Sequence, residues 1–242
     1  MTPHHGGYLL GDQIFCVQNG FASPEFIEKS SCLIAACFKA DPAKQIEELE
    51  PGGLSWDFMV AVFKGGNVCD VVAVCGLVYG RTGEKQYLYV FDVCTDPDLA
   101  HRGIGKVLMG AVDRLRAAAV DDRGCGYWGG MLCSGGLLLL LDVDLHEEGR
   151  VSPDLLKVFY SKCGYVESLS SIAINPVERG GHWRWCITND PDTKRQMWCD
   201  ETTSVCASFH GTVLAELSGC ICAKFQLLEC LNRVVNFMEQ RM

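Results

Sequence analysis

The sequence lacks an apolar run long enough to cross a membrane. Its longest such run, residues 135–141, ends at Asp142, whereas a transmembrane helix needs about 20 consecutive apolar residues. Residues 1–10 contain neither a basic segment nor a long apolar one, so we expect no secretory signal peptide there. These absences predict a protein of the cytoplasm without membrane contact, with the nucleus as an open alternative.

Positive charge is also scarce. Lysine and arginine number 21 against 30 aspartates and glutamates, which gives a formal net charge of −9. Proteins that bind the nucleic-acid backbone usually carry the opposite balance. We therefore expect no direct nucleic-acid partner, and the acidic balance is compatible with a cationic amine or a basic peptide as substrate.

Cysteine pairs at the spacing of a zinc site are missing as well. The 15 cysteines are an odd number spread over the chain, and none forms a Cys-x-x-Cys pair. Free thiols in a reducing compartment are the simplest interpretation, and no metal site is expected. With 48% hydrophobic and 21% charged residues over 242 positions, the chain can bury a substantial core.

Apolar periodicity and turn residues predict an α/β fold. The expected helices lie at residues 24–39, 42–49, 104–115 and 153–163, and the expected strands at residues 13–18, 56–64, 67–79, 87–95, 137–144, 166–175 and 181–188. This order predicts a three-layer mixed sheet, antiparallel at its start, in a domain of residues 12–188. Residues 189–200 are predicted to be a polar loop and residues 203–242 helical, so residues 189–242 form a C-terminal extension.

Glycine and basic residues follow the strand at residues 87–95, directly before a helix. Free N–H groups at the start of a helix point outward, and the helix dipole adds positive potential there. Arg102 and Lys106 add formal charge, and Gly103 and Gly105 let a ligand approach the backbone closely. The pattern predicts a phosphate-binding loop.

The common nucleotide-binding motifs do not fit this loop. A Walker loop requires Ser or Thr after its lysine, where this chain has Val107 after Lys106. The dinucleotide fingerprint requires a third glycine, and Leu108 stands at that position. A nucleotide hydrolase or kinase is therefore disfavoured.

Residues 96–106 and the helix after them resemble the acetyl-CoA pyrophosphate loop of the GNAT-type N-acetyltransferases. The family pattern is Gln/Arg-x-x-Gly-x-Gly/Ala, and residues 100–105 match it except at Ala100, which stands in place of Gln or Arg. The resemblance implies that backbone amides bind the diphosphate of acetyl-CoA, with Arg102 as a compensating charge. The residues that it assigns to this part of the site are Ala100, His101, Arg102, Gly103, Ile104, Gly105 and Lys106.

A second segment, residues 152–165, resembles the later helix of the same family, which commonly ends in Leu-Tyr-x-x-x-Gly-Phe. Ser152 suits the N-cap, Pro153 the first helical position, and Gly164 the left-handed residue after the last turn. Pro153 stands where the family often has Asn. The resemblance extends from the first strand to about Thr188 and implies a GNAT-like mixed sheet flanked by helices.

The resemblance also implies roles on the central strand and on this later helix. The backbones of Val93 and Thr95 would bind the thioester oxygen and the pantetheine arm of acetyl-CoA. Tyr160 aligns with the family tyrosine that protonates the departing thiolate. An ordinary strand end and a half-buried core tyrosine are the structural alternatives for these residues.

An amine with a pKa of about 10 must lose a proton before it can attack a thioester. Asp92 on the central strand is our candidate for the base, directly or through water, and a hydrogen-bonded structural aspartate is the alternative. Asp142, Asp144 and Glu147 are further candidates at the mouth of the site. His101 lies in the phosphate loop and suits a positioning role better.

The resemblance therefore implies an acetyl-CoA-dependent N-acetyltransferase, in which a primary amine of a small molecule or a protein attacks directly in a ternary complex. The alternative is a non-catalytic acyl-CoA-binding or protein-interaction module with a GNAT-like fold. Residues 203–242 place apolar side chains on one helical face. Packing on the domain, lining the acceptor site and formation of a homodimer are all open for this segment.

Overall fold

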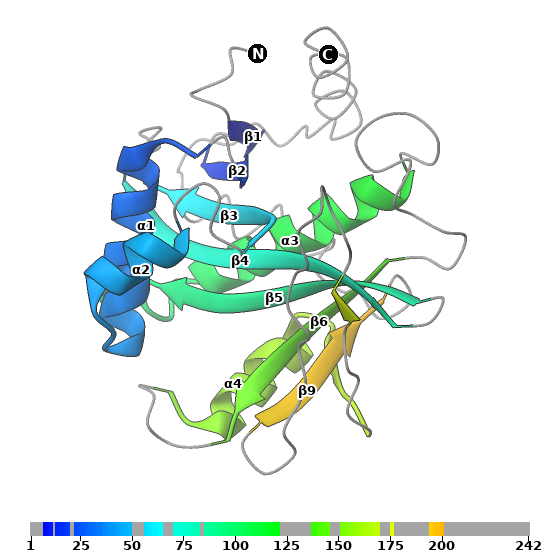
Figure 1. The fold of residues 1–242 in the computed structure, drawn as a ribbon. Coiled ribbons are helices and arrows are strands. Elements are labelled where there is room, and N and C mark those ends of the chain that lie inside the picture. Colours follow the sequence, from blue (N-terminus) through cyan, green and yellow to red (C-terminus); the bar gives the residue numbers. More distant parts are fainter. Residues whose placement is uncertain are drawn as a thin grey trace, which may run out of the picture.

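A mixed β-sheet lies at the centre of the computed structural model, which describes residues 7–11, 13–19, 22–49, 56–64, 70–82, 85–121, 137–145, 151–169, 175–176 and 194–200 (Figure 1). The strands lie in the order β1-β2-β3-β4-β5-β6-β9-β7, and β8 pairs with β4. Their bounds are β1 Gly7–Gly11, β2 Ile14–Gln18, β3 Phe58–Phe63, β4 Val71–Thr82, β5 Lys85–Thr95, β6 Leu137–Asp144, β7 Val166–Glu167, β8 Asn175–Pro176 and β9 Lys194–Cys199.

One neighbouring pair in this order is parallel, and the other pairs are antiparallel. Each neighbouring pair from β1 to β5 is antiparallel, as expected from the hairpins in the sequence. The pair β5 and β6 is parallel, and β9 then pairs antiparallel with β6 and β7. The connection between β5 and β6 carries α3, the usual way of joining parallel neighbours.

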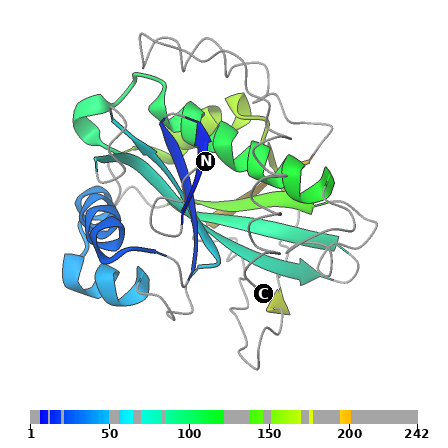
Figure 2. The same cartoon turned by 90° about the horizontal axis from the view of Figure 1, so that it is seen from above.

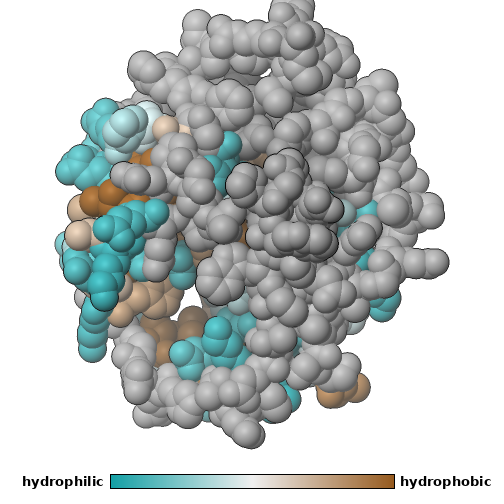
Figure 3. Space-filling view, in the orientation of Figure 1, coloured by the Kyte–Doolittle hydropathy of each residue, from teal (hydrophilic) through white to brown (hydrophobic). Residues whose placement is uncertain are grey.

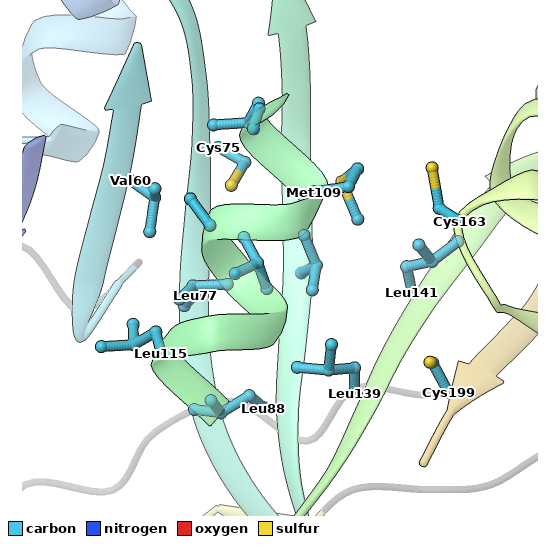
Figure 4. Close-up of a cluster of buried hydrophobic side chains, with 14 of the residues drawn as sticks. Val60, Cys75, Leu77, Leu88, Met109, Leu115, Leu139, Leu141, Cys163 and Cys199 are labelled. Carbon is cyan, nitrogen blue, oxygen red and sulfur yellow. The ribbon is translucent and has the colours of Figure 1, made fainter. Parts of the chain in front are cut away.

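Helices cover both faces of the sheet. Figure 2 shows α1 and α2 on one side of the strands and α3 on the other. Buried residues of α3 and α4 join one apolar cluster with the strands, and buried residues of α1 and α2 join a second cluster on the opposite face. Figure 4 shows part of the first cluster, in which Met109 and Leu115 of α3 lie over strand residues such as Leu77 and Leu139. The helix bounds are α1 Pro24–Phe38, α2 Pro42–Leu49, α3 Ile104–Asp121 and α4 Pro153–Lys162.

Local sequence signals explain where the helices begin and end. The Ser23 hydroxyl accepts a hydrogen bond from the Phe26 amide at 3.2 Å, and α1 begins at the next residue after this cap. Ser152 caps α4 in the same way, with the Leu155 amide at 3.4 Å. Gly164 follows α4 with φ 88°, a conformation that favours glycine. The prediction of a mixed α/β fold flanked by helices is confirmed for the described residues.

Two strands lie outside the predicted domain of residues 12–188. The sheet begins at β1, which pairs with β2, and it includes β9, which falls in the predicted loop of residues 189–200. The prediction of a loop was wrong. β9 begins with charged residues, which are typical of a loop, and it forms a strand because it pairs with the free edge of β6. The predicted strand at residues 181–188 and the helix at residues 203–242 lie outside the described residues, as do any contacts of that extension.

None of the described helices combines the length and the hydropathy needed to span a membrane.

Candidate acyl-transfer site

The parallel strands β5 and β6 separate before either of them ends. Residues 86–90 pair with residues 137–141, yet β5 continues to Thr95 and β6 to Asp144. Beyond this point β5 pairs only with β4, and β6 only with β9. Figure 1 shows the two strands diverging toward their carboxyl ends, and Figure 3 shows a hollow below the end of β5, on the side of α4. The divergence leaves one edge of β5 without a neighbouring strand among the described residues.

A β-bulge at Asp92 explains the change in direction of β5. The register moves from Gly76 opposite Phe91 to Val74 opposite Cys94, so one residue of β4 faces two of β5. Asp92 has φ 49°, a left-handed conformation that is uncommon outside glycine. Bulges bend a strand and increase its twist. The bulge therefore turns β5 away from β6 where the sheet opens.

Backbone groups of β5 face the open edge. The Asp96 amide donates to the Val72 carbonyl of β4 at 2.8 Å. Because backbone groups alternate sides along a strand, Thr95 directs its N–H and C=O away from β4. The Cys37 thiol of α1 donates to the Thr95 carbonyl at 3.5 Å. The roles of Val93 and Thr95 in binding a cofactor stay predictions.

The predicted phosphate loop joins β5 to α3 through a short 3-10 helix, Pro97–Leu99. The Asp96 carboxylate accepts from the Asp98 amide at 3.0 Å and so fixes the start of the loop. His101 and Gly103 both have positive φ, 64° and 82°, which reverses the chain before Ile104 begins α3. A loop between this strand and the helix, and Ile104 as the first residue of the helix, are confirmed, while phosphate binding stays a prediction.

The backbone amides of this loop differ in what they bind. The Ala100 amide donates to Pro97 at 3.2 Å and the Lys106 amide donates to Gly103 at 3.0 Å, so both ends of the loop are engaged with the chain. The amides from His101 to Gly105 have no acceptor among the described residues. They lie at the amino-terminal end of α3, where the helix dipole favours an anion.

The loop packs directly against α4. A β-carbon at Gly105 would lie 3.2 Å from the ring of Phe159 and 3.6 Å from the Thr95 hydroxyl. A side chain here would require the Phe159 ring to move by a few tenths of an ångström, so glycine suits this close approach of β5, α3 and α4. The two segments that carry the family resemblance are therefore in contact in the fold.

Tyr160 of α4 lies in the apolar cluster between α4 and the sheet. It is 7% exposed, and its ring makes edge contacts with Phe159 and Tyr165 at centroid distances of 5.0 and 5.9 Å. Burial, with smaller effects from neighbouring thiols including Cys75 and Cys94, raises the pKa of its hydroxyl. Tyr160 is therefore protonated at neutral pH, as a proton donor must be.

A second tyrosine forms a contact that the sequence did not predict. The Tyr89 hydroxyl of β5 donates to Asp142 Oδ2 of β6 at 3.0 Å. Asp142 is the first residue of β6 beyond the pairing with β5. Its position directly after an apolar run was the signal in the sequence, but nothing there identified Tyr89 as its partner. Asp144 is exposed at the end of β6, and Glu147 lies outside the described residues.

No family model matches this chain, and no curated protein matches it. Among solved structures, Escherichia coli ElaA is similar at 12% identity and a TM-score of 0.47, over 78% of this chain and 99% of that one. An aminoglycoside 6'-acetyltransferase type Ii is similar at 16% identity and a TM-score of 0.46, over 76% of this chain and 96% of that one. A GNAT-family acetyltransferase from Staphylococcus aureus Mu50 has 14% identity and a TM-score of 0.46, over 77% of this chain and 98% of that one. Similarity this remote does not assign an activity. The order of the strands, the helices on both faces and the loop between β5 and α3 agree with the mixed α/β fold that was predicted from the sequence.

Proposed function

We propose that this chain is an N-acetyltransferase that transfers the acetyl group of acetyl-CoA to a primary amine. The observation that carries the proposal is the run of backbone amides from His101 to Gly105, which lack an acceptor among the described residues at the start of α3. They lie beside the carboxyl end of β5, beyond the point where β5 and β6 separate. An anion site and an open strand edge in contact suit a ligand with a diphosphate and an extended arm.

In this proposal acetyl-CoA is a co-substrate whose diphosphate binds to the loop amides. Arg102 is exposed and Lys106 is half-buried, so both can add positive charge at the same place. The pantetheine arm then hydrogen-bonds to the backbone of Val93 and Thr95, as a further strand would. A backbone donor at the thioester oxygen stabilises the charge that develops there, and losing one such donor costs about 3–4 kcal/mol in well-studied enzymes.

The proposed reaction is direct attack of the amine nitrogen on the thioester carbonyl. The new C–N bond forms, the C–S bond breaks, and the sulfur leaves as a thiolate that takes the Tyr160 proton. Before attack, the ammonium loses one proton to Asp92, directly or through water, and Asp92 later releases it to solvent. After attack, the nitrogen loses a second proton to the Tyr160 oxygen through water, which restores the tyrosine and leaves a neutral amide. No covalent enzyme intermediate is needed.

A non-catalytic acyl-CoA-binding or protein-interaction module is the second candidate. Ala100 favours it, because the exposed methyl group cannot make the contacts of the Gln or Arg in the family pattern. An acyl-CoA-binding module differs from the enzyme in turnover and not in cofactor binding, whereas a protein-interaction module need not bind the cofactor.

Calorimetry with acetyl-CoA and a thiol-release assay over a panel of primary amines test the proposal. An enzyme binds acetyl-CoA and releases free CoA thiol only when an acceptor amine is present. Binding without thiol release over small amines, polyamines and lysine peptides would favour the non-catalytic module. A chain that does not bind acetyl-CoA would contradict the transferase and the acyl-CoA-binding module, and would favour the protein-interaction module.

A further inference from the structure

The thiols of Cys37 and Cys94 meet at the carboxyl end of β5. Cys37 lies in the last turn of α1, and Cys94 precedes Thr95 in β5. We propose that this pair is an oxidation site, in which peroxide converts the two thiols to a disulfide and the disulfide weakens the binding of acetyl-CoA. Formation of the disulfide is independent of the proposed function, whereas its effect on acetyl-CoA rests on that function.

Two contacts join α1 to β5 at this point. The Cys37 thiol donates to the Thr95 carbonyl at 3.5 Å. The Cys94 thiol hydrogen-bonds to the sulfur of Cys37, and both side chains belong to the apolar cluster between α1 and the sheet. The two sulfurs are therefore in contact before any oxidation, although they come from distant parts of the sequence.

The two thiols differ in their access to solvent. Among the cysteines that the structure describes, only Cys32 and Cys37 are not buried, whereas Cys94 is 2% exposed. A peroxide molecule therefore reaches Cys37 first. Cys94 lies behind it, where it can react with the product on Cys37 without itself meeting the oxidant.

The hydrogen bond between the thiols also determines which of them ionises. It is the largest of the effects, with burial second, that raise the pKa of the Cys94 thiol. Cys94 therefore keeps its proton when the pair loses one, and the thiolate forms on Cys37. Because the thiolate is the reactive form of cysteine, the accessible member of the pair is also the nucleophile.

The proposed reaction has two steps. The Cys37 thiolate attacks one oxygen of hydrogen peroxide, the O–O bond breaks, and the second oxygen leaves as hydroxide, which becomes water with the proton that Cys37 has lost. The sulfur of Cys94 then attacks the sulfenic acid on Cys37, so the S–S bond forms and the S–O bond breaks. The hydroxyl group leaves with the Cys94 proton as water. Two thiols are oxidised by two electrons, and one peroxide is reduced to two waters.

The disulfide alters the segment to which the pantetheine arm is proposed to bind. A disulfide holds its two sulfurs about 2 Å apart, which is closer than two hydrogen-bonded thiols, so the end of α1 or of β5 must shift. Cys37 also loses the proton that it donates to the Thr95 carbonyl. Thr95 follows Cys94 directly and moves with it. Oxidation should therefore weaken acetyl-CoA binding.

Peptide mapping of the full-length protein tests the oxidation site. The protein is treated with hydrogen peroxide, its remaining thiols are blocked with N-ethylmaleimide, and tryptic peptides are analysed by mass spectrometry without reduction. Trypsin leaves Cys32 and Cys37 in one peptide, residues 30–39, so Cys32→Ser is the control that identifies the bond. The wild type and Cys32→Ser should both link this peptide to the one that contains Cys94, and dithiothreitol should separate them. Cys37→Ser and Cys94→Ala should not form the link.

Calorimetry with acetyl-CoA tests the effect of the disulfide. Peroxide should raise the Kd at least tenfold in the wild type and in Cys32→Ser, dithiothreitol should restore it, and the Kd of Cys37→Ser should not respond to peroxide. Thermal unfolding of each variant shows whether the fold is retained.

The absence of the linked peptides in peroxide-treated Cys32→Ser would overturn the oxidation site. Linked peptides with an unchanged Kd, or an equal response of Cys37→Ser to peroxide, would overturn the effect on acetyl-CoA. A reduced wild type that does not bind acetyl-CoA would contradict the proposed transferase, and the linked peptides would still establish the disulfide.

Discussion

The ring of Phe91 fills the space where a side chain on Gly76 would lie. A β-carbon built on Gly76 would be 2.2 Å from Cζ of that ring, across the paired strands β4 and β5. The two residues lie opposite each other at the point where the bulge begins. Glycine on one strand and a large ring on the other therefore stabilise the bend that opens the sheet.

A double-mutant cycle tests this relationship. Gly76→Ala should destabilise the protein by about 1–3 kcal/mol, because the ring must move out of a packed site. In the Phe91→Ala background the same change should cost much less, since the space is vacant. Chemical denaturation of the four proteins measures the coupling. Equal costs in both backgrounds would show that Gly76 is needed for another reason.

Ala100→Gln restores the residue of the family pattern at the exposed start of the loop. If the loop binds a diphosphate, the added amide donor should tighten acetyl-CoA binding roughly three- to tenfold, the net value of one ordinary hydrogen bond at an exposed position. Ala43→Gln, at an exposed position of α2, is the matched control and should leave affinity unchanged. Calorimetry measures both. An unchanged affinity for Ala100→Gln would argue against a phosphate beside this residue.

Tyr160→Phe removes the proposed acid and keeps the ring in the core. We expect kcat to fall roughly 100-fold, the effect of losing a positioned proton donor, with little change in the Kd of acetyl-CoA. Tyr165→Phe is the control, because it removes a hydroxyl from the adjacent ring at 5.9 Å. A wild-type kcat for Tyr160→Phe, or the same loss for both variants, would remove Tyr160 from the mechanism.

Asp92→Asn removes the proposed base and introduces a side chain that fits the same backbone conformation. Asparagine tolerates the left-handed conformation that Asp92 adopts at φ 49°. The rate with a cationic amine should fall roughly 100-fold, and the rate with aniline should fall less because aniline has already lost the proton. Asp144→Asn, at the exposed end of β6, should leave both rates near those of the wild type. The opposite ranking would assign the base to Asp144.

The cost of Asp142 to the fold depends on pH. Burial raises the pKa of this carboxyl in the folded state, so its charged form is disfavoured by folding. The contribution of this carboxyl to the stability of the folded protein is therefore greatest below about pH 4, its pKa in the unfolded chain. That contribution is lost as the pH rises through the higher pKa of Asp142 in the folded state. Asp142→Asn should therefore stabilise the protein at pH 7, by about 1 kcal/mol because the side chain is only half-buried. Denaturation at both pH values should show this gain disappear near pH 4, and a gain of equal size at both would exclude titration of Asp142 as its cause.

Local elements were predictable because their signals lie within a few residues of one another. Ser23 and Ser152 cap α1 and α4, Gly164 ends α4, and the apolar stripe from Ile104 forms α3. Neighbouring residues alone decide whether a cap or a left-handed turn forms. The loop between β5 and α3 belongs to this group, since its glycines and the helix that follows lie next to each other in the sequence.

Contacts between distant segments required the tertiary structure. The bulge at Asp92 depends on Gly76 and Phe91 meeting across two strands. β9 could be placed only by the free edge of β6, and the bond from Tyr89 to Asp142 joins residues that are 53 positions apart. Sequence periodicity shows which face of a strand is apolar, but not which strand lies beside it or with what register. The chain therefore encodes its helices and its loop locally, whereas the opening of the sheet and the carboxylate beside it arise only when β4, β5, β6 and β9 pair.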